Sequence, residues 1–334
     1  MYRIGRYRRK VVRENLKKSF PEKDKKERLQ IERRFYRYLS DYMLEDLKML
    51  HMSPEDLYKR MTYKNTEQYL ELTEKYGGII VMIPHYANYE WLIGMGSIMK
   101  PGDVPMQVYK PLKDKYLNEL FQRIRSRFGG YNVPKHSTAR EIIKLKREGK
   151  KMVVGLITDQ WPSGNEKYWT TFLGQETAFL NGAERIAKMM NFPVFYCDLT
   201  KPGRGYCVAE FKLMTEKPKE TGEGEITEMF ADYLEQTIRR EPLIGCGLIN
   251  VGKLLRLNVK GGKDESVSGY FELERVRYAS YFSSVRDPLF EERRSRSLCG
   301  RQWLYGCFCG NASGGISLCP DHCAGSESWI RRWI

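Results

Sequence analysis

The 334-residue sequence has no run of about 18 apolar residues, the length that a helix needs to cross a bilayer. No apolar segment follows its basic start either, so we predict neither a transmembrane helix nor a signal peptide. It contains no G-x-G-x-x-G or P-loop pattern. Its four histidines, at positions 51, 85, 136 and 322, have no metal-ligand spacing. We therefore expect no metal and no cofactor.

Acidic residues are outnumbered by basic ones, 42 against 57, and the net charge is +15. This favours an anionic partner: nucleic acid, an anionic membrane surface or a phosphorylated substrate. Residues 3–20 are strongly basic, with apolar residues at roughly helical spacing. The segment is either an amphipathic helix on an anionic membrane or a solvated helix with a basic outer face. Because no aromatic residues are interleaved with a basic patch, we expect no nucleic-acid partner, which filter binding at physiological salt tests.

Strands alternate with helices over residues 77–240, which predicts an α/β fold with a mostly parallel central sheet flanked by helices, preceded by an N-terminal helical segment. We expect three regions: a basic, membrane-facing helical segment at 1–76, an α/β core at 77–242 and a tail at 243–334. The expected strands are 79–83, 105–109, 152–158, 193–198 and, at or near the sheet edge, 206–214. The expected helices are 26–50, 54–61, 65–75, 88–99, 112–128, 137–148, 181–190 and 226–240, with a loop at 161–180.

The stretch 77–91, GGIIVMIPHYANYEW, reads as one unit. Two glycines end a helix, five apolar residues form a buried strand, and His85 follows that strand after a single proline. Asn88 is a good helix N-cap, which places Glu90 in the first helical turn. Ligands of open α/β sheets bind at the carboxyl ends of strands. A histidine there with a carboxylate is a general base with its orienting group; the alternative is a structural histidine that caps a strand end.

Other polar residues extend this candidate site. Asp159 and Gln160 also follow a predicted strand, and they either line the same pocket or mark a turn. The apolar segment 172–182 either beds an acyl chain or is core beneath a loop. Four basic residues either grip phosphates or a phosphopantetheine-bearing protein, or form a solvated helix face: Lys110, Arg123, Arg125 and Arg127.

Six blocks of sequence carry a family resemblance. They are RYRRKVVRENLKKSFPEK, VMIPHYANYEW, VYKPLKDKYLNELFQRIRSRFG, GLITDQWP, TFLGQETAFLNGAERIAK and NFPVFY, in this order. Over about residues 3–242 the chain resembles the lipid A biosynthesis acyltransferases, the lauroyl and myristoyl transferases, a branch of the lysophospholipid acyltransferases. The resemblance implies a glycerolphosphate-acyltransferase-like fold.

The resemblance also implies a chemistry. His85 and Glu90 match the family's catalytic H-x4-D/E signature, with Glu90 orienting the ring, so His85→Ala or Glu90→Ala is expected to abolish transfer. The implied donor is an acyl-carrier-protein thioester, and the implied acceptor is a lipid A precursor hydroxyl at the cytoplasmic face of the inner membrane. Lys110 occupies the family's basic position in the VYRP block, where lysine lacks the two-pronged phosphate grip of arginine. Alternatives are another lysolipid or aminolipid acceptor, or an inactive truncated member.

Both ends depart from the family pattern. The chain starts just after the position of the family's apolar anchor helix, so we expect peripheral membrane attachment. The family closes its last helix with P-x-N-W-L-W-x-H-x-R-W-K, where this chain reads PLIGCGLINVGK. A suitable choice of codons for residues 243–253 spells NWLWSHKRWK in another frame, followed by a stop at 263–265.

The remaining frame then begins MKVSVVILNWNG and later reads ADNGSTDA, which resembles a family 2 glycosyltransferase. We therefore hypothesise a frameshift near residues 242–244 and no stable fold for 265–334; the gene's nucleotide sequence tests this. The alternative is a real cysteine-rich module with zinc on Cys307, Cys309, Cys319 and Cys323.

Overall fold

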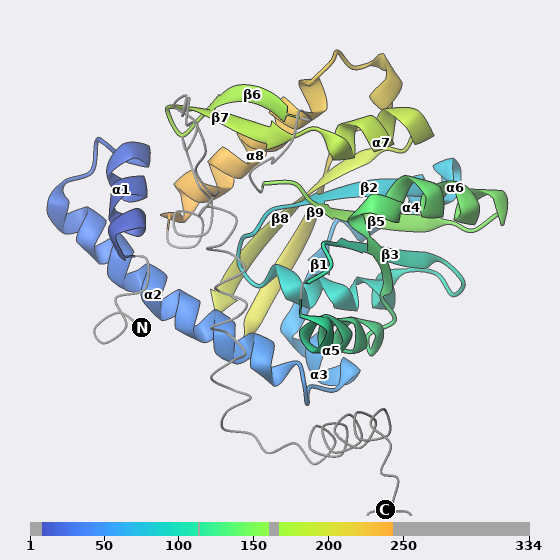
Figure 1. Ribbon diagram of the computed structural model, residues 1–334, viewed down its shortest axis with the longest axis horizontal. Helices are drawn as coiled ribbons and strands as arrows, with labels where there is room; N and C mark the ends of the chain where they lie inside the picture. The colour runs from blue at the N-terminus through green and yellow to red at the C-terminus, as the bar shows by residue number, and fades with distance from the viewer. Residues whose placement is uncertain (1–8, 113, 160–166, 243–334) are drawn as a thin grey trace, which may run out of the picture. The chain divides into compact units, whose positions relative to one another are not determined.

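A computed structural model describes residues 9–112, 114–159 and 167–242, all within one unit that spans 1–260 (Figure 1). The helices are α1 (Arg9–Ser19), α2 (Lys25–Lys48), α3 (Pro54–Arg60), α4 (Thr66–Tyr76), α5 (Lys115–Ser126), α6 (Thr138–Arg147), α7 (Gly182–Met190) and α8 (Glu225–Arg240), with 3₁₀ helices η1 (Tyr89–Ile98), η2 (Lys135–Ser137) and η3 (Pro218–Glu220). The strands are β1 (Met61–Lys64), β2 (Gly78–Ile83), β3 (Val104–Tyr109), β4 (Tyr131–Pro134), β5 (Met152–Ile157), β6 (Lys167–Phe172), β7 (Gln175–Leu180), β8 (Val194–Gly203) and β9 (Tyr206–Thr215).

Seven strands form the central sheet, in the order β1-β9-β8-β2-β5-β3-β4. All neighbouring pairs in this order are parallel except β8 and β9, which form an antiparallel hairpin. Helices flank the sheet (Figure 1). The prediction of an α/β fold with a mostly parallel, helix-flanked sheet and an N-terminal helix is therefore confirmed.

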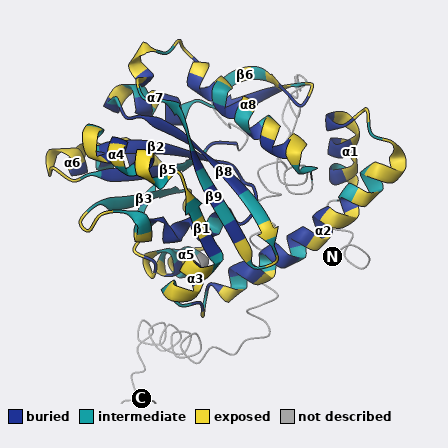
Figure 2. Cartoon of the chain, turned by 180° about the vertical axis from the view of Figure 1, so that it is seen from behind, coloured by how far each residue is buried: buried dark blue, intermediate teal, exposed yellow. Residues whose placement is uncertain are grey.

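Strand β2 is the buried centre of this sheet. Every one of its residues is buried, as a strand with parallel neighbours and helices on both faces requires. Gly77 ends α4 at φ +71°, a left-handed conformation that glycine adopts without steric cost. At Gly78 a Cβ atom would lie 2.6 Å from the Phe192 ring, so only glycine lets this ring pack against the strand. Figure 2 shows that the neighbouring strands β5 and β8 are also mostly buried, although less so towards their carboxyl ends.

The two N-terminal helices pack together by their apolar sides. A reciprocal cap starts α2: Asp24 accepts from the Glu27 amide at 2.7 Å, and Glu27 accepts from the Asp24 amide at 2.8 Å. On and beside α1, the side chains of Val12, Leu16 and Phe20 are at most 2% exposed. Since this apolar stripe faces the protein, the described residues fit the second interpretation, a helix with a basic outer face.

Several elements differ from the sequence-based expectations. Strands β1 and β4 were missed, because four residues are too few to establish a period of two. The expected loop at 161–180 contains the β6–β7 hairpin, and its two turn residues, Leu173 and Gly174, have φ of +50° and +72°. Two central residues at positive φ are what a tight type I′ hairpin turn requires. Leucine is an unusual residue there, and it conceals the turn.

The segment expected as an α-helix at 88–99 is the 3₁₀ helix η1. It is buried along most of its length, and Gly94 and Gly96 approach Leu57 and Pro105 closely enough that a Cβ would crowd them. The expectation that Asn88 caps this helix with its side chain is wrong. The side-chain amide of Asn88 donates instead to the carboxylate of Glu45 on α2.

No described helix combines the length and the apolar character that a membrane crossing demands. Some expectations lie outside the described residues: the start of the basic segment at 3–8, Gln160, and the tail 243–334 with its frameshift and zinc interpretations. The three-region division stays a prediction, although β1, which precedes residue 76, pairs with β9 in the central sheet.

Candidate active site

The carboxyl ends of β2 and β5 form the topological switch point of the sheet. The two strands are parallel neighbours, with Ile83 opposite Ile157. The chain leaves β2 towards β3, on the far side of β5, and leaves β5 towards β8, on the far side of β2. Connections that leave two neighbouring strands in opposite directions open a crevice, and ligands of open α/β sheets bind there.

His85 and Asp159 each lie two residues beyond these strand ends, and they meet. The His85 Nδ1 atom is 2.5 Å from Asp159 Oδ1, and the His85 backbone amide donates to Asp159 Oδ2 at 2.6 Å. The two residues are 4% and 6% exposed. The Tyr89 ring contacts the imidazole edge to face, with centroids 4.8 Å apart. One carboxylate thus fixes both the main chain and the ring of the histidine.

This arrangement selects one tautomer of the imidazole. An ionised carboxylate only accepts hydrogen bonds, so Asp159 favours the proton on Nδ1 and leaves the Nε2 lone pair as the basic site. A carboxylate at Nδ1 also stabilises the imidazolium that forms when Nε2 takes up a proton. The pair has the geometry of a general base with its orienting group.

Glu90, the carboxylate expected to orient the ring, pairs with Arg125. Its Oε2 atom is 3.4 Å from Arg125 Nη2, and both side chains are mostly buried, at 11% and 17% exposure. The Arg125 guanidinium also lies over the rings of Tyr109 and Phe121, at 5.9 and 5.5 Å from their centroids. The structure thus brings Glu90 together with Arg125 and brings Asp159, predicted only as a pocket residue, to the histidine.

The remaining predicted basic residues separate in space. Arg127 donates to the carbonyls of Met49, Leu50 and Met52, so it caps the carboxyl end of α2 and ties α5 to it. Arg123 is exposed on α5. Lys110 is exposed and directly follows β3, the other neighbour of β5, so it lies at the same sheet edge as Asp159.

The apolar segment considered as an acyl-chain bed is core. Phe172 and Phe179 are at most 2% exposed, pack edge to face on each other, and Phe179 contacts Phe230 of α8. Of the two interpretations of residues 172–182, the described side chains fit the second.

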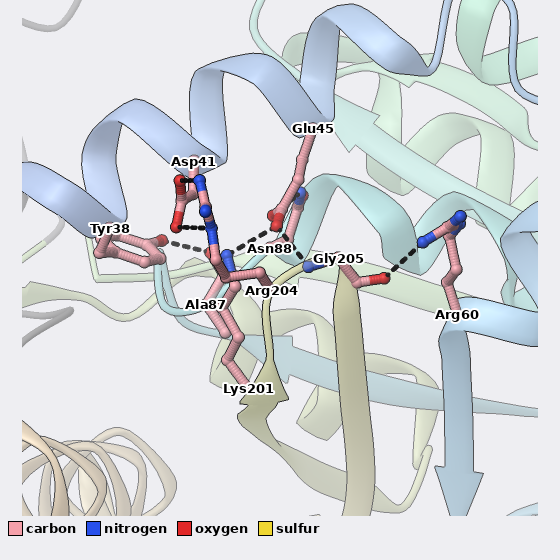
Figure 3. Close-up of polar contacts among 9 residues, drawn as sticks. All are labelled: Tyr38, Asp41, Glu45, Arg60, Ala87, Asn88, Lys201, Arg204 and Gly205. Carbon is pink, nitrogen blue, oxygen red and sulfur yellow. Dashed lines mark hydrogen bonds and ion pairs between the residues drawn. The ribbon is translucent and has the colours of Figure 1, made fainter.

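The turn that follows His85 is held by α2: Figure 3 shows Tyr38 and Glu45 of this helix reaching Ala87 and Asn88. Ala87 has φ +48°, and its carbonyl accepts from the Tyr38 hydroxyl at 2.6 Å. The Asn88 amide donates to Glu45 at 3.1 Å, and Lys201 of the β8–β9 hairpin donates to the same carboxylate at 2.8 Å. Sequence reasoning missed these residues because their partners are more than 40 positions away.

A second buried carboxylate lies at the same edge on β8. Asp198, 2% exposed, accepts from both Nη atoms of Arg240, at 2.7 and 2.9 Å, and from Lys212 Nζ at 2.6 Å. Burial raises the pKa of Asp198, but the hydrogen bonds from Arg240 and Lys212 outweigh it and hold that pKa below its ordinary value. One residue beyond Arg240, the Glu241 carbonyl accepts from the Tyr86 hydroxyl at 2.9 Å, so the end of α8 reaches the His85 turn.

The sequence was compared with known proteins. It matches the model of the bacterial lipid A biosynthesis acyltransferase family over residues 1–244. A comparison with curated proteins gives no match. The family match covers 244 of the 334 residues and includes every described element of the fold. The chain therefore belongs to the bacterial lipid A biosynthesis acyltransferase family, whose activity is that of an O-acyltransferase.

Proposed function

We propose that this O-acyltransferase takes its acyl chain from an acyl-carrier-protein thioester and transfers it to a hydroxyl of a lipid A precursor, with His85 as the general base. The observation that carries the proposal is the contact of Asp159 with His85 Nδ1 at the switch point of the sheet. Family membership supplies the reaction class, which is acyl transfer to a lipid acceptor.

The proposed reaction runs through one tetrahedral intermediate. His85 Nε2 takes the proton of the acceptor hydroxyl as its oxygen attacks the thioester carbonyl carbon. The carbonyl oxygen becomes an oxyanion, stabilised by backbone amides and nearby basic groups. The carbon–sulfur bond then breaks, the carrier thiolate leaves, and the proton on Nε2 passes to it. The products are the acylated lipid and the free thiol of the carrier, so atoms and charge balance.

The proposed partners follow from the charge of the chain and the place of its basic residues. Lys110, at the same edge as Asp159, and the exposed Arg123 are proposed to contact acceptor phosphates or the acidic carrier protein. Glu90, as the second member of the family signature, is proposed to act at the same site through its pair with Arg125. The net charge of +15 supports binding to an anionic membrane surface. We propose that this surface is the cytoplasmic face of the inner membrane.

An assay of the purified full chain tests the donor and the acceptor separately. The chain is incubated with a lipid A precursor and either an acyl-carrier-protein thioester or the matching coenzyme A thioester, and mass spectrometry reads the product. We expect the precursor to gain one acyl group from the carrier-protein donor. Equal rates with coenzyme A would overturn the proposed donor. Acylation of a lysophospholipid in preference to the lipid A precursor would overturn the proposed acceptor.

A genetic experiment tests the same proposal inside cells. Lipid A from a deletion strain is expected to lack one acyl chain, which the wild-type gene restores and the His85→Ala gene does not. Unchanged lipid A mass in the deletion strain would contradict the proposed acceptor.

A further inference from the structure

The turn between β2 and η1 is strained, and partners on both sides hold it. Ala87 has φ +48°, a conformation that a residue with a Cβ atom adopts only when its surroundings impose it. On one side Asp159 binds the amide and ring of His85. On the other side, the Tyr38 hydroxyl of α2 donates to the Ala87 carbonyl, and the Glu45 carboxylate of α2 accepts from the side-chain amide of Asn88.

On the α2 side of the turn, Glu45 binds Asn88, Lys201 and Gly205, a set of contacts that we call the Glu45 clamp (Figure 3). Its Oε2 atom accepts from Asn88 Nδ2 at 3.1 Å, while its Oε1 atom accepts from Lys201 Nζ and from the Gly205 amide, each at 2.8 Å. The Glu45 and Lys201 side chains are only 11% and 10% exposed. A charge so far from water needs its partner, so Lys201 fixes where the Glu45 carboxylate lies.

This clamp has a direct consequence for the histidine. Asn88 is three residues from His85, and its side chain is drawn to Glu45 and away from the capping position on η1. A general base must lie within hydrogen-bond reach of the proton that it takes up, so small displacements of its backbone slow the reaction. A carboxylate that fixes Asn88 therefore acts on the place of His85 without touching a substrate.

We propose that Glu45 is a positioning residue for acyl transfer, which holds the His85 turn through Asn88 and is itself held by Lys201. The inference rests on the proposed role of His85 as the base. This role means that α2, which lies outside the His85–Asp159 pair, contributes to catalysis as well as packing on the sheet.

The chain offers a matched control one helical turn away. Asp41 also lies on α2 and also binds the β8–β9 turn, through Arg204, whose Nε and Nη2 atoms are 2.9 and 2.5 Å from the carboxylate. Arg204 is 77% exposed, and among the described residues the side-chain bonds of Asp41 go to Arg204 and not to residues 85–88. Asp41→Asn and Glu45→Gln thus remove the same charge from the same helix, but only Glu45→Gln reaches the His85 turn.

The experiment compares these two variants in the full chain, with the acyl-carrier-protein thioester and a lipid A precursor as substrates. We expect Glu45→Gln to lower kcat about 10- to 100-fold with KM nearly unchanged, since geometry at the base changes and substrate contacts do not. We expect Asp41→Asn to stay within about two-fold of the wild type, as for an ion pair with one exposed partner. Equal kcat values in the two variants would overturn the proposal.

A second variant and a second measurement complete the test. Asn88→Ala leaves Glu45 with Lys201 and Gly205, so no buried charge loses its partner and the fold is retained; it is expected to reproduce the loss of kcat. Amide hydrogen exchange of the peptide around residues 85–89 is expected to speed up in Glu45→Gln and not in Asp41→Asn. Unchanged exchange in Glu45→Gln would overturn the proposal even if the enzyme were inactive. Activity retained in His85→Ala would instead overturn the proposed function and leave the exchange result standing.

Discussion

Two buried aspartates at the same edge of the sheet have opposite surroundings. Asp159, after β5, has the titratable ring of His85 as its partner. Asp198, on the other side of β2, is bound by two cationic side chains, Arg240 and Lys212. Both carboxylates are nearly inaccessible, at 6% and 2% exposure, so burial alone does not separate their roles.

The difference lies in whether the partner can change its charge. A carboxylate at Nδ1 of an imidazole orients the ring and stabilises the imidazolium that forms when the ring takes up a proton. A carboxylate saturated by two cations has no proton to exchange, and it fastens the end of α8 to β8 and β9. We infer that Asp159 serves the reaction and Asp198 serves the fold.

Removing the imidazole has the largest expected effect. His85→Ala is expected to lower acyl transfer about 10⁴-fold, because the proposed general base for the acceptor hydroxyl is lost. The measurement is the rate of product formation from a labelled thioester. His136→Ala, at an exposed position in η2, is the matched control and should transfer at the wild-type rate. A His85→Ala rate near that of His136→Ala would show that His85 is not the general base.

The aspartate pair gives the next largest contrast. Asp159→Asn is expected to lower kcat about 10³-fold, since an amide NH₂ donates to Nδ1 and forces the proton onto Nε2, where it blocks base catalysis. Asp198→Asn makes the same chemical change, carboxylate to amide, at the same edge of the sheet, and it should keep kcat within about three-fold of the wild type. Equal losses of kcat in Asp159→Asn and Asp198→Asn would contradict the different roles inferred for the two aspartates.

Glu90 and Arg125 sharpen the comparison further. If Glu90 acts through its ion pair, Glu90→Ala and Arg125→Ala should each lower kcat about 10- to 100-fold, and the double variant should be no worse than either one. If Glu90 acts on His85 directly, as its place in the H-x4-E signature predicts, Glu90→Ala abolishes transfer while Arg125→Ala does not. The double-mutant cycle in kcat decides between these outcomes.

The smallest effect on activity, and the clearest on stability, belongs to Asp198. Because Arg240 and Lys212 lose the charge of their buried acceptor, Asp198→Asn is expected to cost about 2 kcal/mol in the free energy of unfolding, measured by urea titration. The lowered pKa sets the sign of the pH dependence. The stability from Asp198 is present above the ordinary aspartate pKa of about 3.9 and is lost as the pH falls through the lower folded value.

The wild type should therefore lose stability in acid faster than Asp198→Asn does. Parallel stability curves for the two proteins below pH 4 would show that the Arg240 and Lys212 contacts contribute nothing at this site.

The larger elements could be predicted because their patterns are local. The apolar run of β2 and the glycine at 77 each depend on neighbouring residues. Strand β1 could not be predicted, since its four residues are a strand only because β9 lies beside them. The β6–β7 turn was hidden by a leucine at positive φ.

The site was half predictable for a related reason. His85 is visible because a proline and a buried strand precede it. Its partner Asp159 depends on the register of β2 and β5, which places Asp159 beside His85 from 74 positions away, whereas the Glu90 carboxylate pairs with Arg125. Glu45 and Lys201 carried no local signal at all. At the other end, the family match stops at residue 244, within the junction at 242–244 where we hypothesise a frameshift, and the gene's nucleotide sequence tests that hypothesis.

The tautomer of His85 tests the central claim most directly. In a long-range ¹H–¹⁵N spectrum of the histidine-labelled chain, the His85 signals are identified by their loss in His85→Ala. We predict that the neutral ring carries its proton on Nδ1 and a lone pair on Nε2, and that Asp159→Asn reverses this pattern. A neutral ring with its proton on Nε2, or a pattern that Asp159→Asn leaves unchanged, would contradict the account.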